Sequence, residues 1–339
     1  MHCRVTTEYQ RRGLDVVVLE NRHLRVELLA GKGGDVTELR DKRTDVNVLF
    51  EAPHEWRAPG ESYVGSPDAS FAYLDHYPGG WQNVAPNAGG ASTVRGAPFG
   101  LHGGAALAPW DATVVADGPD RVAVRLTTAL TRYPLRLERL VSLAAGEATL
   151  TVADELTNVG EVPVPYAWLQ HVAFGPPLLD PAATVTVPCG TAVADPGHDD
   201  PNARFEPGAE GAWPTPTGAD GSAVDLCSPP PKDERVHDLL ALGELEDGWY
   251  DLTNPELDLG VRVTFPADRY EYVWYWGAFG GFEAAPFFGR NYTLGLEPCT
   301  SVPNAGLAEA METGTAEEIA PGETHGATLT VSTHAADES

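Results

Sequence analysis

The amino-acid sequence predicts an all-β fold, built as a sandwich or barrel of antiparallel sheets. Apolar and polar residues alternate with a period of two along many short runs rich in β-branched and aromatic residues, which is the pattern of half-buried strands. The 36 glycines and 29 prolines divide the chain between these runs. Helical periodicity is scarce. One helix is expected, from residue 305 to about 313, with Asn304 as N-cap and Gly314 at its end.

The predicted strands extend over nearly the whole chain. They cover residues 14–19, 24–29, 36–40, 112–115, 122–126, 135–143, 148–153, 249–252, 260–265, 270–276, 292–296 and 327–332. The alternation is clearest between residues 110 and 154, where adjacent hairpins predict a sheet with one wet and one dry face. A chain of 339 residues can bury a large core, and it shows no repeat of fixed period. We therefore expect a single domain over residues 1–339.

Two long segments, near 52–100 and 195–235, are expected to be loop-rich insertions. Both are dense in glycine and proline, and loops of this length in a compact domain are usually functional or disordered. The first segment also carries many aromatic residues, namely Trp56, Tyr63, Phe71, Tyr73, Tyr77 and Trp81. We therefore expect it to be packed and to line a site. The second segment is expected to be a surface excursion, because strand patterns resume beyond it.

The charge balance excludes some classes of partner. The formal net charge is −27, and only three of the 22 basic residues are lysines. Nucleic acids and anionic membranes both require clustered lysine and arginine, so neither is expected as a partner. The acidic surface is consistent with solubility or with adaptation to a high-salt cytoplasm. A GC-rich genome would explain the preference for arginine equally well.

The N-terminus and the cysteines indicate a soluble, cytoplasmic protein. The first residues lack the apolar core of a signal peptide, and no apolar run is long enough to cross a membrane. The four cysteines, which are Cys3, Cys189, Cys227 and Cys299, show no Cys-x-x-Cys spacing. In a chain of this length they are expected to be reduced thiols and not a disulfide framework.

Three side chains are the candidates for chemistry. Glu297 ends a β-rich apolar run and is followed at once by Pro298, so its charge must be solvated, paired or functional. His102 lies between glycines, and His171 lies in a run of aromatic and aliphatic residues. Taken alone, each histidine is more often a hydrogen-bonded turn or core residue. Together, two imidazoles and a carboxylate are sufficient for acid–base catalysis near neutral pH.

Aromatic and amide side chains suggest a sugar ligand. Trp274 and Trp276 share one face of a predicted strand, where they could stack on a sugar ring, although core packing is the more common role of such residues. Gln82 and Asn83 lie in an aromatic turn, and an amide can donate and accept hydrogen bonds to sugar hydroxyls. Simple turn chemistry is an equally good interpretation of these two amides.

Other catalytic signatures are missing from the sequence. There is no Gly-x-Ser-x-Gly elbow, P-loop, dinucleotide fingerprint or His-Glu-x-x-His motif. The segment His198-Asp-Asp200 could contact a metal, but a solvated loop is the simpler interpretation. We therefore expect neither a metal nor a cofactor.

Several motifs in chain order resemble the galactose mutarotase-like, or aldose 1-epimerase, superfamily. They are Gly-Leu-His102-Gly, then Trp-Leu-Gln-His171 followed by Phe-Gly-x-Pro-Leu-Leu, then Gly-Leu-Glu297-Pro-x-Thr-x-x-Pro-Asn. Two further motifs add to the likeness: Gly31-Lys-Gly-Gly-Asp-Val-Thr-Glu-Leu-Arg-Asp-Lys42 and Asp247-Gly-Trp-Tyr-Asp-Leu-Thr-Asn-Pro255. The likeness covers roughly residues 14–333, and the chain resembles a divergent branch of the superfamily. The resemblance implies a β-supersandwich with very few short helices and a sugar cleft.

The resemblance also implies an activity and a role for each candidate. Glu297 would be the base that takes the proton of the anomeric hydroxyl, and His171 the acid that protonates the ring oxygen. His102 would bind the substrate near that oxygen. The expected function is thus interconversion of the α and β anomers of a free monosaccharide, without cofactor or metal. A non-catalytic sugar-binding protein, or a lyase or hydrolase on the same scaffold, remains an alternative.

The chain departs from the family pattern at two places. Classical members carry an arginine in the loop before the first histidine, and here the Gln82-Asn83 loop stands near that place. They also carry an aspartate that holds ring hydroxyls, for which Asp251, and secondarily Asp238, are the candidates in this chain. These departures bear on the identity of the sugar more than on the chemistry.

Overall fold

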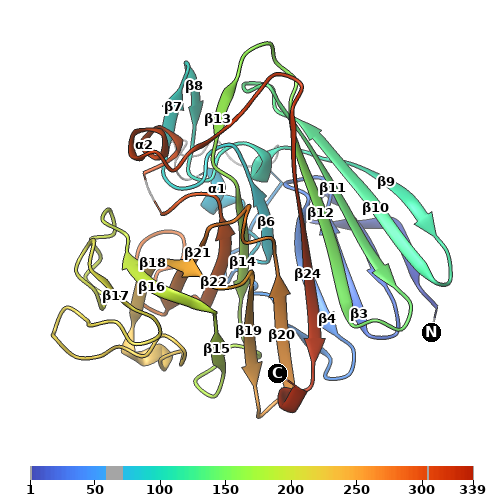
Figure 1. The fold of residues 1–339 in the computed structure, drawn as a ribbon. Coiled ribbons are helices and arrows are strands. Elements are labelled where there is room, and N and C mark those ends of the chain that lie inside the picture. The colour runs from blue at the N-terminus through green and yellow to red at the C-terminus, as the bar shows by residue number, and fades with distance from the viewer. Residues whose placement is uncertain (1, 59–71, 304, 339) are drawn as a thin grey trace.

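Two large antiparallel sheets form the framework of the computed structural model, which describes residues 2–58, 72–303 and 305–338 (Figure 1). The larger sheet has 12 strands among these residues. In spatial order they are β1 (Arg4–Arg11), β2 (Leu14–Glu20), β3 (Leu24–Leu29), β4 (Asp35–Asp41), β6 (Trp81–Val84), β14 (Leu169–Phe174), β22 (Tyr292–Cys299), β21 (Tyr272–Phe279), β18 (Val236–Leu245), β16 (Cys189–Ala194) and β17 (Glu210–Ala212), with β5 (Val46–Asn47) beside β4.

The second sheet has eight strands in the described part of the chain. Their order is β15 (Thr184–Thr186), β19 (Trp249–Asn254), β20 (Leu259–Thr264), β24 (Thr324–His334), β12 (Thr149–Asn158), β11 (Leu135–Ala144), β10 (Arg121–Ala129) and β9 (Asp111–Asp117). Two small sheets pair β13 (Val164–Tyr166) with β23 (Glu317–Ile319), and β7 (Ser92–Val94) with β8 (Ala97–Phe99).

Helices are few and short within the described ranges. They are α1 (Ala72–Asp75), α2 (Leu307–Thr313) and the 3₁₀ turns η3 (Ala105–Leu107), η4 (Lys232–Glu234) and η5 (Ala336–Glu338). None of them combines the length and the apolar composition needed to span a bilayer. The all-β prediction is therefore confirmed.

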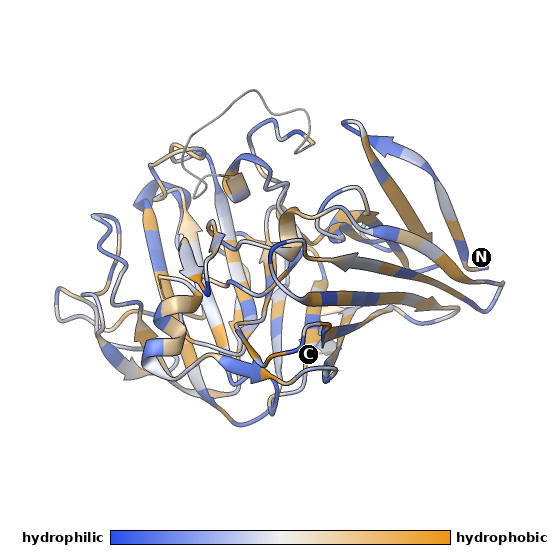
Figure 2. Cartoon of the chain, turned by 90° about the horizontal axis from the view of Figure 1, so that it is seen from above, coloured by the Kyte–Doolittle hydropathy of each residue, from blue (hydrophilic) through white to orange (hydrophobic). Residues whose placement is uncertain are grey.

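The strands form where side chains of opposite character alternate. In β11, for example, Leu135 and Leu137 are buried on one face and Arg136 is exposed on the other, as the two-residue period of a strand requires. Figure 2 shows hydrophobic and hydrophilic bands alternating along many strands. Most buried hydrophobic residues of the two sheets join in one cluster that extends from Cys3 to Val331, and a small second cluster lies on β2 and β3.

A buried polar network also connects the two sheets. Arg139 on β11 binds Asp154 with two bonds of 2.8 Å, and it donates to the amide oxygen of Gln170 on β14 at 3.0 Å. Gln170 also accepts from Trp81 of β6 at 2.8 Å and donates to Tyr270 at 2.9 Å. These buried groups form hydrogen bonds with one another. The network therefore holds β14 and β6 in register from the interior face of the larger sheet.

Several predicted boundaries need correction. The strand that carries Glu297 does not break at Pro298: β22 continues to Cys299, and Pro298 lies opposite Val273. The segment 52–100 is not a plain insertion, because it supplies β6, which pairs with both β4 and β14. The predicted helix begins later, at Leu307.

Some predictions at these boundaries are confirmed, and some lie where the structure gives no description. Gly314 ends α2 with a left-handed φ of 76°, a conformation that glycine adopts without strain. The predicted N-cap Asn304 lies outside the described residues, as do Tyr63 and Phe71.

Candidate active site

A cavity of about 230 Å³ lies over the larger sheet and contains the predicted catalytic residues. Its walls come from strands β14, β18, β21 and β22 and from loops in the segments near 72–103 and 195–200. The lining residues are Tyr73, Leu74, Tyr77, Gly89, Gly90, Leu101, His102, His171, His198, His237, Leu239, Trp274, Trp276, Phe282, Glu297 and Pro303. The lining is mainly aromatic and apolar, with few polar groups, as in small-molecule sites.

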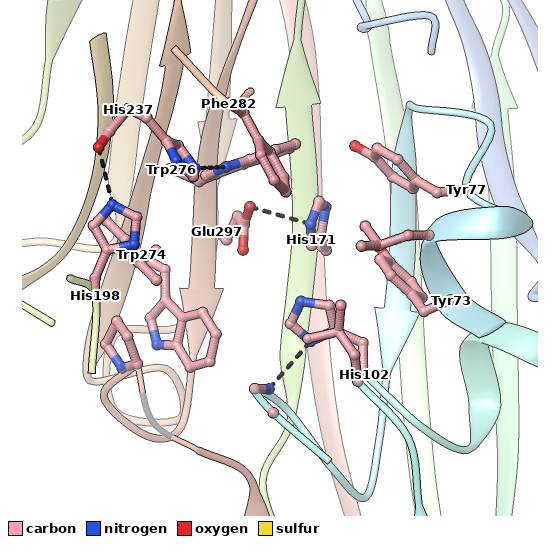
Figure 3. A pocket seen from close by; sticks show the side chains of 16 residues that line it. Tyr73, Tyr77, His102, His171, His198, His237, Trp274, Trp276, Phe282 and Glu297 are labelled. Atoms are coloured by element: carbon pink, nitrogen blue, oxygen red, sulfur yellow. Dashed lines mark hydrogen bonds and ion pairs between the residues drawn. The ribbon is translucent and has the colours of Figure 1, made fainter. Parts of the chain in front are cut away.

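Glu297 and His171 face each other at the centre of this cavity (Figure 3). They lie on adjacent antiparallel strands, β22 and β14, whose register places Leu169 opposite Cys299 and Ala173 opposite Gly295. Nε2 of His171 lies 3.4 Å from Oε1 of Glu297. Both residues are buried, with 5% and 1% of their surface exposed. Cross-strand pairing thus joins two residues that are 126 positions apart in the sequence.

A glycine makes room for the carboxyl group. A Cβ atom at Gly295 would lie 2.2 Å from Oε1 of Glu297, a distance no real structure tolerates. The side chains of residues 295 and 297 point to the same face of β22, since side chains alternate along a strand. Only glycine at position 295 therefore permits this position of the Glu297 side chain.

Burial sets the protonation of the pair. Removal from water raises the pKa of Glu297 well above its usual value and lowers the pKa of His171 well below its own, with the neighbouring His102 contributing to the second shift. Both shifts disfavour the charged forms. Burial therefore favours the neutral pair, with the proton on the Glu297 carboxyl group, over the ion pair. Oε1 of Glu297 and Nδ1 of His171 are buried and have no hydrogen-bond partner among the described residues.

His102 is held as a hydrogen-bond donor. Nδ1 of its ring accepts a hydrogen bond from the backbone N–H of Gly89 at 3.1 Å. The backbone N–H of His102 donates to the Gly89 carbonyl at 3.0 Å. Nε2 must therefore carry the proton of the neutral ring. Burial lowers the pKa of His102 to about 3, so the ring stays neutral at physiological pH. The backbone φ of 47° at His102 is unusual for a residue other than glycine, and the ring lies 5.4 Å from that of His171.

Aromatic rings enclose the two histidines. Trp274 and Trp276 both line the cavity, which confirms that they share one face of β21. The rings of Tyr77 and Trp276 lie 5.3 and 5.7 Å from that of His171. The Tyr77 hydroxyl is buried without a partner in the described structure. Trp274 donates its Nε1–H to the carbonyl of Ser301 at 2.6 Å, which fixes the plane of its ring against the cavity.

The aromatic segment near residues 72–81 lines the site only in part. Tyr73 and Tyr77 line the cavity, as expected. Trp81 instead points into the space between the sheets, where it donates to Gln170. Trp56 belongs to a separate buried cluster and lies under the guanidinium groups of Arg11 and Arg12.

The two predicted amides do not contact the cavity. Gln82 lies behind Tyr73: its amide donates to the Gly79 carbonyl at 2.7 Å and accepts the Tyr73 hydroxyl at 3.3 Å. Asn83 lies on the opposite face of β6, where it accepts the indole N–H of Trp168 at 2.8 Å. The structure assigns Gln82 to support of the cavity wall and Asn83 to the interior, because adjacent residues of a strand face opposite sides.

Neither candidate aspartate reaches the cavity. Asp251 lies on β19 of the other sheet, where it binds Arg262 and His334, each at 3.0 Å. Asp238 is fully buried and binds Arg204 at 2.7 Å. Asp251 therefore does not lie with Glu297 and His171, because period-two patterning gives no information on which sheet a strand joins.

Two histidines that line the cavity, and an aspartate that contacts one of them, were not predicted as site residues. His198 and His237 line the cavity, and Asp200 contacts His237 at 2.8 Å. Burial lowers the pKa of His237. The segment His198-Asp-Asp200 was a recognisable signal in the sequence, but His237 comes from β18 and carried no signal of its own. The loop after β16 and the strand β18 are separated in the sequence but meet at this side of the cavity.

Several solved structures share the fold of this chain. One is a candidate aldose 1-epimerase from Klebsiella pneumoniae, with a TM-score of 0.74, 16% sequence identity and coverage of 99% of this chain and 84% of that one. The Slr1438 protein of Synechocystis has a TM-score of 0.65, 18% identity and coverage of 97% and 98%. A galactose mutarotase-like protein from Lactobacillus casei has a TM-score of 0.60, 17% identity and coverage of 94% and 100%. The chain therefore has the galactose mutarotase-like fold.

Residues 11–333 match the family model described as "Domain of unknown function (DUF4432)". The match covers most of the chain, so the protein belongs to this family. Curated protein sequences give no match.

Proposed function

We propose that the protein interconverts the α and β anomers of a free aldose by acid–base ring opening in the cavity around Glu297 and His171. The observation that carries this proposal is the approach of Nε2 of His171 to Oε1 of Glu297 at 3.4 Å, in a small cavity that both side chains line. The galactose mutarotase-like fold of this chain and of the solved structures supports it.

The reaction requires one acid and one base. Glu297 takes the proton of the anomeric hydroxyl, the electrons of that O–H bond form the C1 carbonyl, and the bond from C1 to the ring oxygen breaks. His171 protonates the ring oxygen. Rotation about C1–C2 followed by the reverse transfers gives the other anomer. The Nε2–H of His102 donates to an oxygen near the ring, and Trp274 and Trp276 pack on the apolar face of the sugar.

Glu297 and His171 share one transferable proton, which is the number that these proton transfers require. Desolvation raises the pKa of Glu297 and so favours that proton on its carboxyl group. Transfer across the 3.4 Å contact to His171 gives the carboxylate and imidazolium required for ring opening. Sugar hydroxyls that donate to the carboxylate replace its lost hydration and stabilise this form. Substrate binding thus sets the protonation state that catalysis uses.

A hydrolase on the same scaffold receives less support. Glycosidases generally use two carboxyl groups that flank the scissile bond. Among the described residues that line this cavity, Glu297 is the one carboxylic acid. The geometry therefore favours proton transfer on a single sugar over hydrolysis of a glycosidic bond.

The test is the rate of anomer exchange. Purified protein is added to freshly dissolved aldoses, and exchange is followed by polarimetry or by NMR exchange spectroscopy across a broad panel that includes neutral, amino and acidic sugars. We expect acceleration for at least one sugar. Exchange at the uncatalysed rate for every sugar would refute the enzymatic proposal, and saturable sugar binding seen by calorimetry in that case would establish a binding protein instead.

A further inference from the structure

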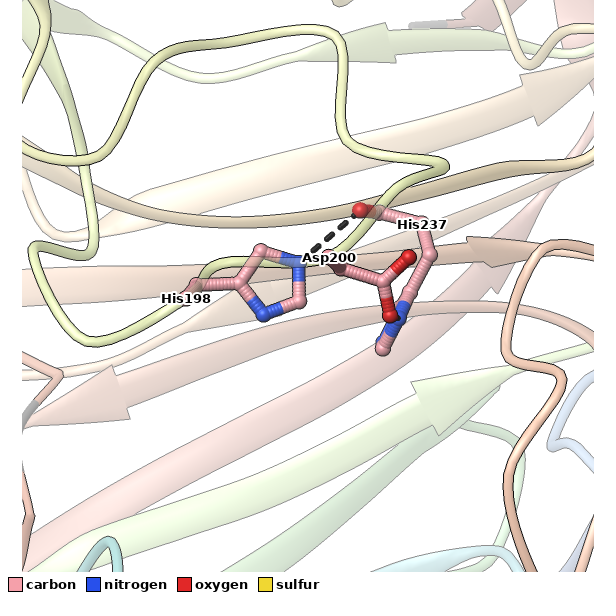
Figure 4. Close-up of side chains that lie close together, drawn as sticks. All are labelled: His198, Asp200 and His237. Carbon is pink, nitrogen blue, oxygen red and sulfur yellow. Dashed lines mark hydrogen bonds and ion pairs between the residues drawn. The ribbon is translucent and has the colours of Figure 1, made fainter.

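A second polar cluster lies on the cavity wall across from His102 (Figure 3). It consists of His198 and Asp200, from the loop after β16, and His237, near the start of β18. One nitrogen or oxygen atom from each of these side chains lies within 4.8 Å of the corresponding atoms of the other two. Figure 4 shows the Asp200 carboxylate against the His237 ring, with the His198 ring beside them.

The distances within this cluster suit a shared cation. Nδ1 of His237 lies 2.8 Å from Oδ2 of Asp200. At the tetrahedral angle usual for zinc, two ligands at about 2.1 Å from one ion lie about 3.4 Å apart, so a small separation of these two atoms would admit an ion between them. The imidazole rings of His198 and His237 meet edge to face with centroids 4.7 Å apart. Nε2 of His198 pairs with the His237 carbonyl at 2.9 Å.

The surrounding contacts hold each of these side chains in place. Oδ1 of Asp200 accepts the backbone N–H of Asn202 at 2.8 Å, so Oδ2 is directed to His237. The His237 ring stacks on Phe282 at 4.6 Å with an interplanar angle of 10°. Such outer contacts orient the ligands of metal sites and are needed for tight binding.

We propose that His198, Asp200 and His237 form a binding site for a divalent transition-metal ion in the wall of the cavity. Two imidazoles and one carboxylate are the ligand types that zinc and its neighbours in the first transition series prefer. Because His198 and His237 both line the cavity, the remaining coordination positions face it and are accessible to an oxygen atom of a bound molecule. The site depends on its own three ligands and not on the sugar reaction.

The experiment measures binding of the metal alone. Protein treated with chelator and dialysed is titrated with Zn²⁺ by calorimetry, and in parallel with Co²⁺ while its visible d–d absorption is recorded. We expect about one tight equivalent per chain and a cobalt spectrum typical of nitrogen and oxygen ligands. His198→Ala and Asp200→Asn should each weaken Zn²⁺ binding by about tenfold or more, and the double variant should abolish the cobalt bands.

Matched controls separate this site from general binding to an acidic protein. His325→Ala removes an imidazole that contacts two carboxylates, Glu317 at 3.7 Å and Glu323 at 3.0 Å, and it should leave the tight equivalent unchanged. Circular dichroism and thermal unfolding verify that each variant is folded. His237 is not substituted, because its ring packs on Phe282. Absence of a tight equivalent in the wild type, or equal affinity in the His198, Asp200 and His325 variants, would overturn the proposal.

Discussion

The two walls of the cavity contain similar side chains, but the polar atoms of one wall lack hydrogen-bond partners and those of the other wall have them. On one wall, Oε1 of Glu297, Nδ1 of His171 and the hydroxyl of Tyr77 are buried without partners in the described structure. On the other wall, Asp200, His198 and His237 bind one another or the backbone. Each buried polar atom without a partner costs about 1–3 kcal/mol. The first wall is therefore arranged for a ligand that supplies the missing partners.

This contrast indicates that the polar atoms without hydrogen-bond partners lower the free energy of unfolding in return for a functional site. Active sites commonly hold strained or unsatisfied groups whose removal stabilises the protein. The second wall instead contributes to stability even when no ion is bound, because its hydrogen bonds are already formed. Variants of the two walls should consequently differ in the sign of their effect on stability.

The largest effect is expected for Glu297→Gln. The amide cannot take a proton, so anomer exchange should fall by about 10²- to 10⁴-fold. The measurement is exchange of the preferred sugar, followed by NMR. Retention of more than a tenth of the rate would show that Glu297 is not the base.

The same variant should be at least as stable as the wild type at pH 8. Burial raises the pKa of Glu297 above its unfolded value, so its contribution to stability is complete below the unfolded pKa and is lost as the pH rises through the folded pKa. Glutamine has no such loss. The stability advantage of Glu297→Gln, measured by urea unfolding, should therefore shrink from pH 8 to pH 5. An advantage that grows toward pH 5 would contradict the assigned pKa direction.

A smaller but clear effect is expected for Gly295→Ala. The added Cβ would lie 2.2 Å from Oε1 of Glu297, so the carboxyl group must move away from His171. We expect anomer exchange to fall by about 10²-fold, since displacement of a reacting group by about 1 Å has effects of this size. Gly243→Ala on β18 is the control, because its Cβ would meet a side-chain oxygen of Thr191 at 3.1 Å. Equal losses in both variants would indicate a general effect on the sheet.

The next prediction concerns the acid sensitivity that His102 confers. Its pKa falls from the usual 6.5 to about 3 on folding, so its contribution to stability is present above pH 6.5 and is lost as the pH falls toward the folded pKa. Between these values the wild type should lose ~1.4 kcal/mol per pH unit relative to His102→Gln. Urea unfolding of both proteins at pH 7, 6 and 5 measures the difference. Parallel curves would show that the ring is protonated in the folded state.

The smallest effect on sugar chemistry is expected for Asp251→Asn. Its carboxylate binds Arg262 and His334 on the other sheet, far from the cavity residues in the strand order. Anomer exchange should remain unchanged while the unfolding temperature falls, because the amide replaces a charged partner of Arg262. A rise in KM for the sugar would restore Asp251 as a candidate ligand of the substrate.

Much of the fold and the centre of the site could be predicted from the sequence. The runs at residues 14–19 and 135–143 became β2 and β11, because alternation is a local property of the chain. The edge strand β1 was not predicted, since most of its residues are exposed or only half-buried. Strand β6 was missed as well, because all four of its residues are buried and it shows no alternation.

The sequence alone determined the all-β class, the acidic surface and the three chemical groups at Glu297, His171 and His102, because residue type and two-residue periodicity are local. Only the tertiary structure decided which of these groups meet. The register between β14 and β22 brings His171 to Glu297, and the loop after β16 brings His198 and Asp200 to His237. Partner strands are selected by long-range packing of whole sheets, which leaves no mark on neighbouring residues. For this reason the sequence could not show that Asp251 lies on a different sheet from Glu297 and His171.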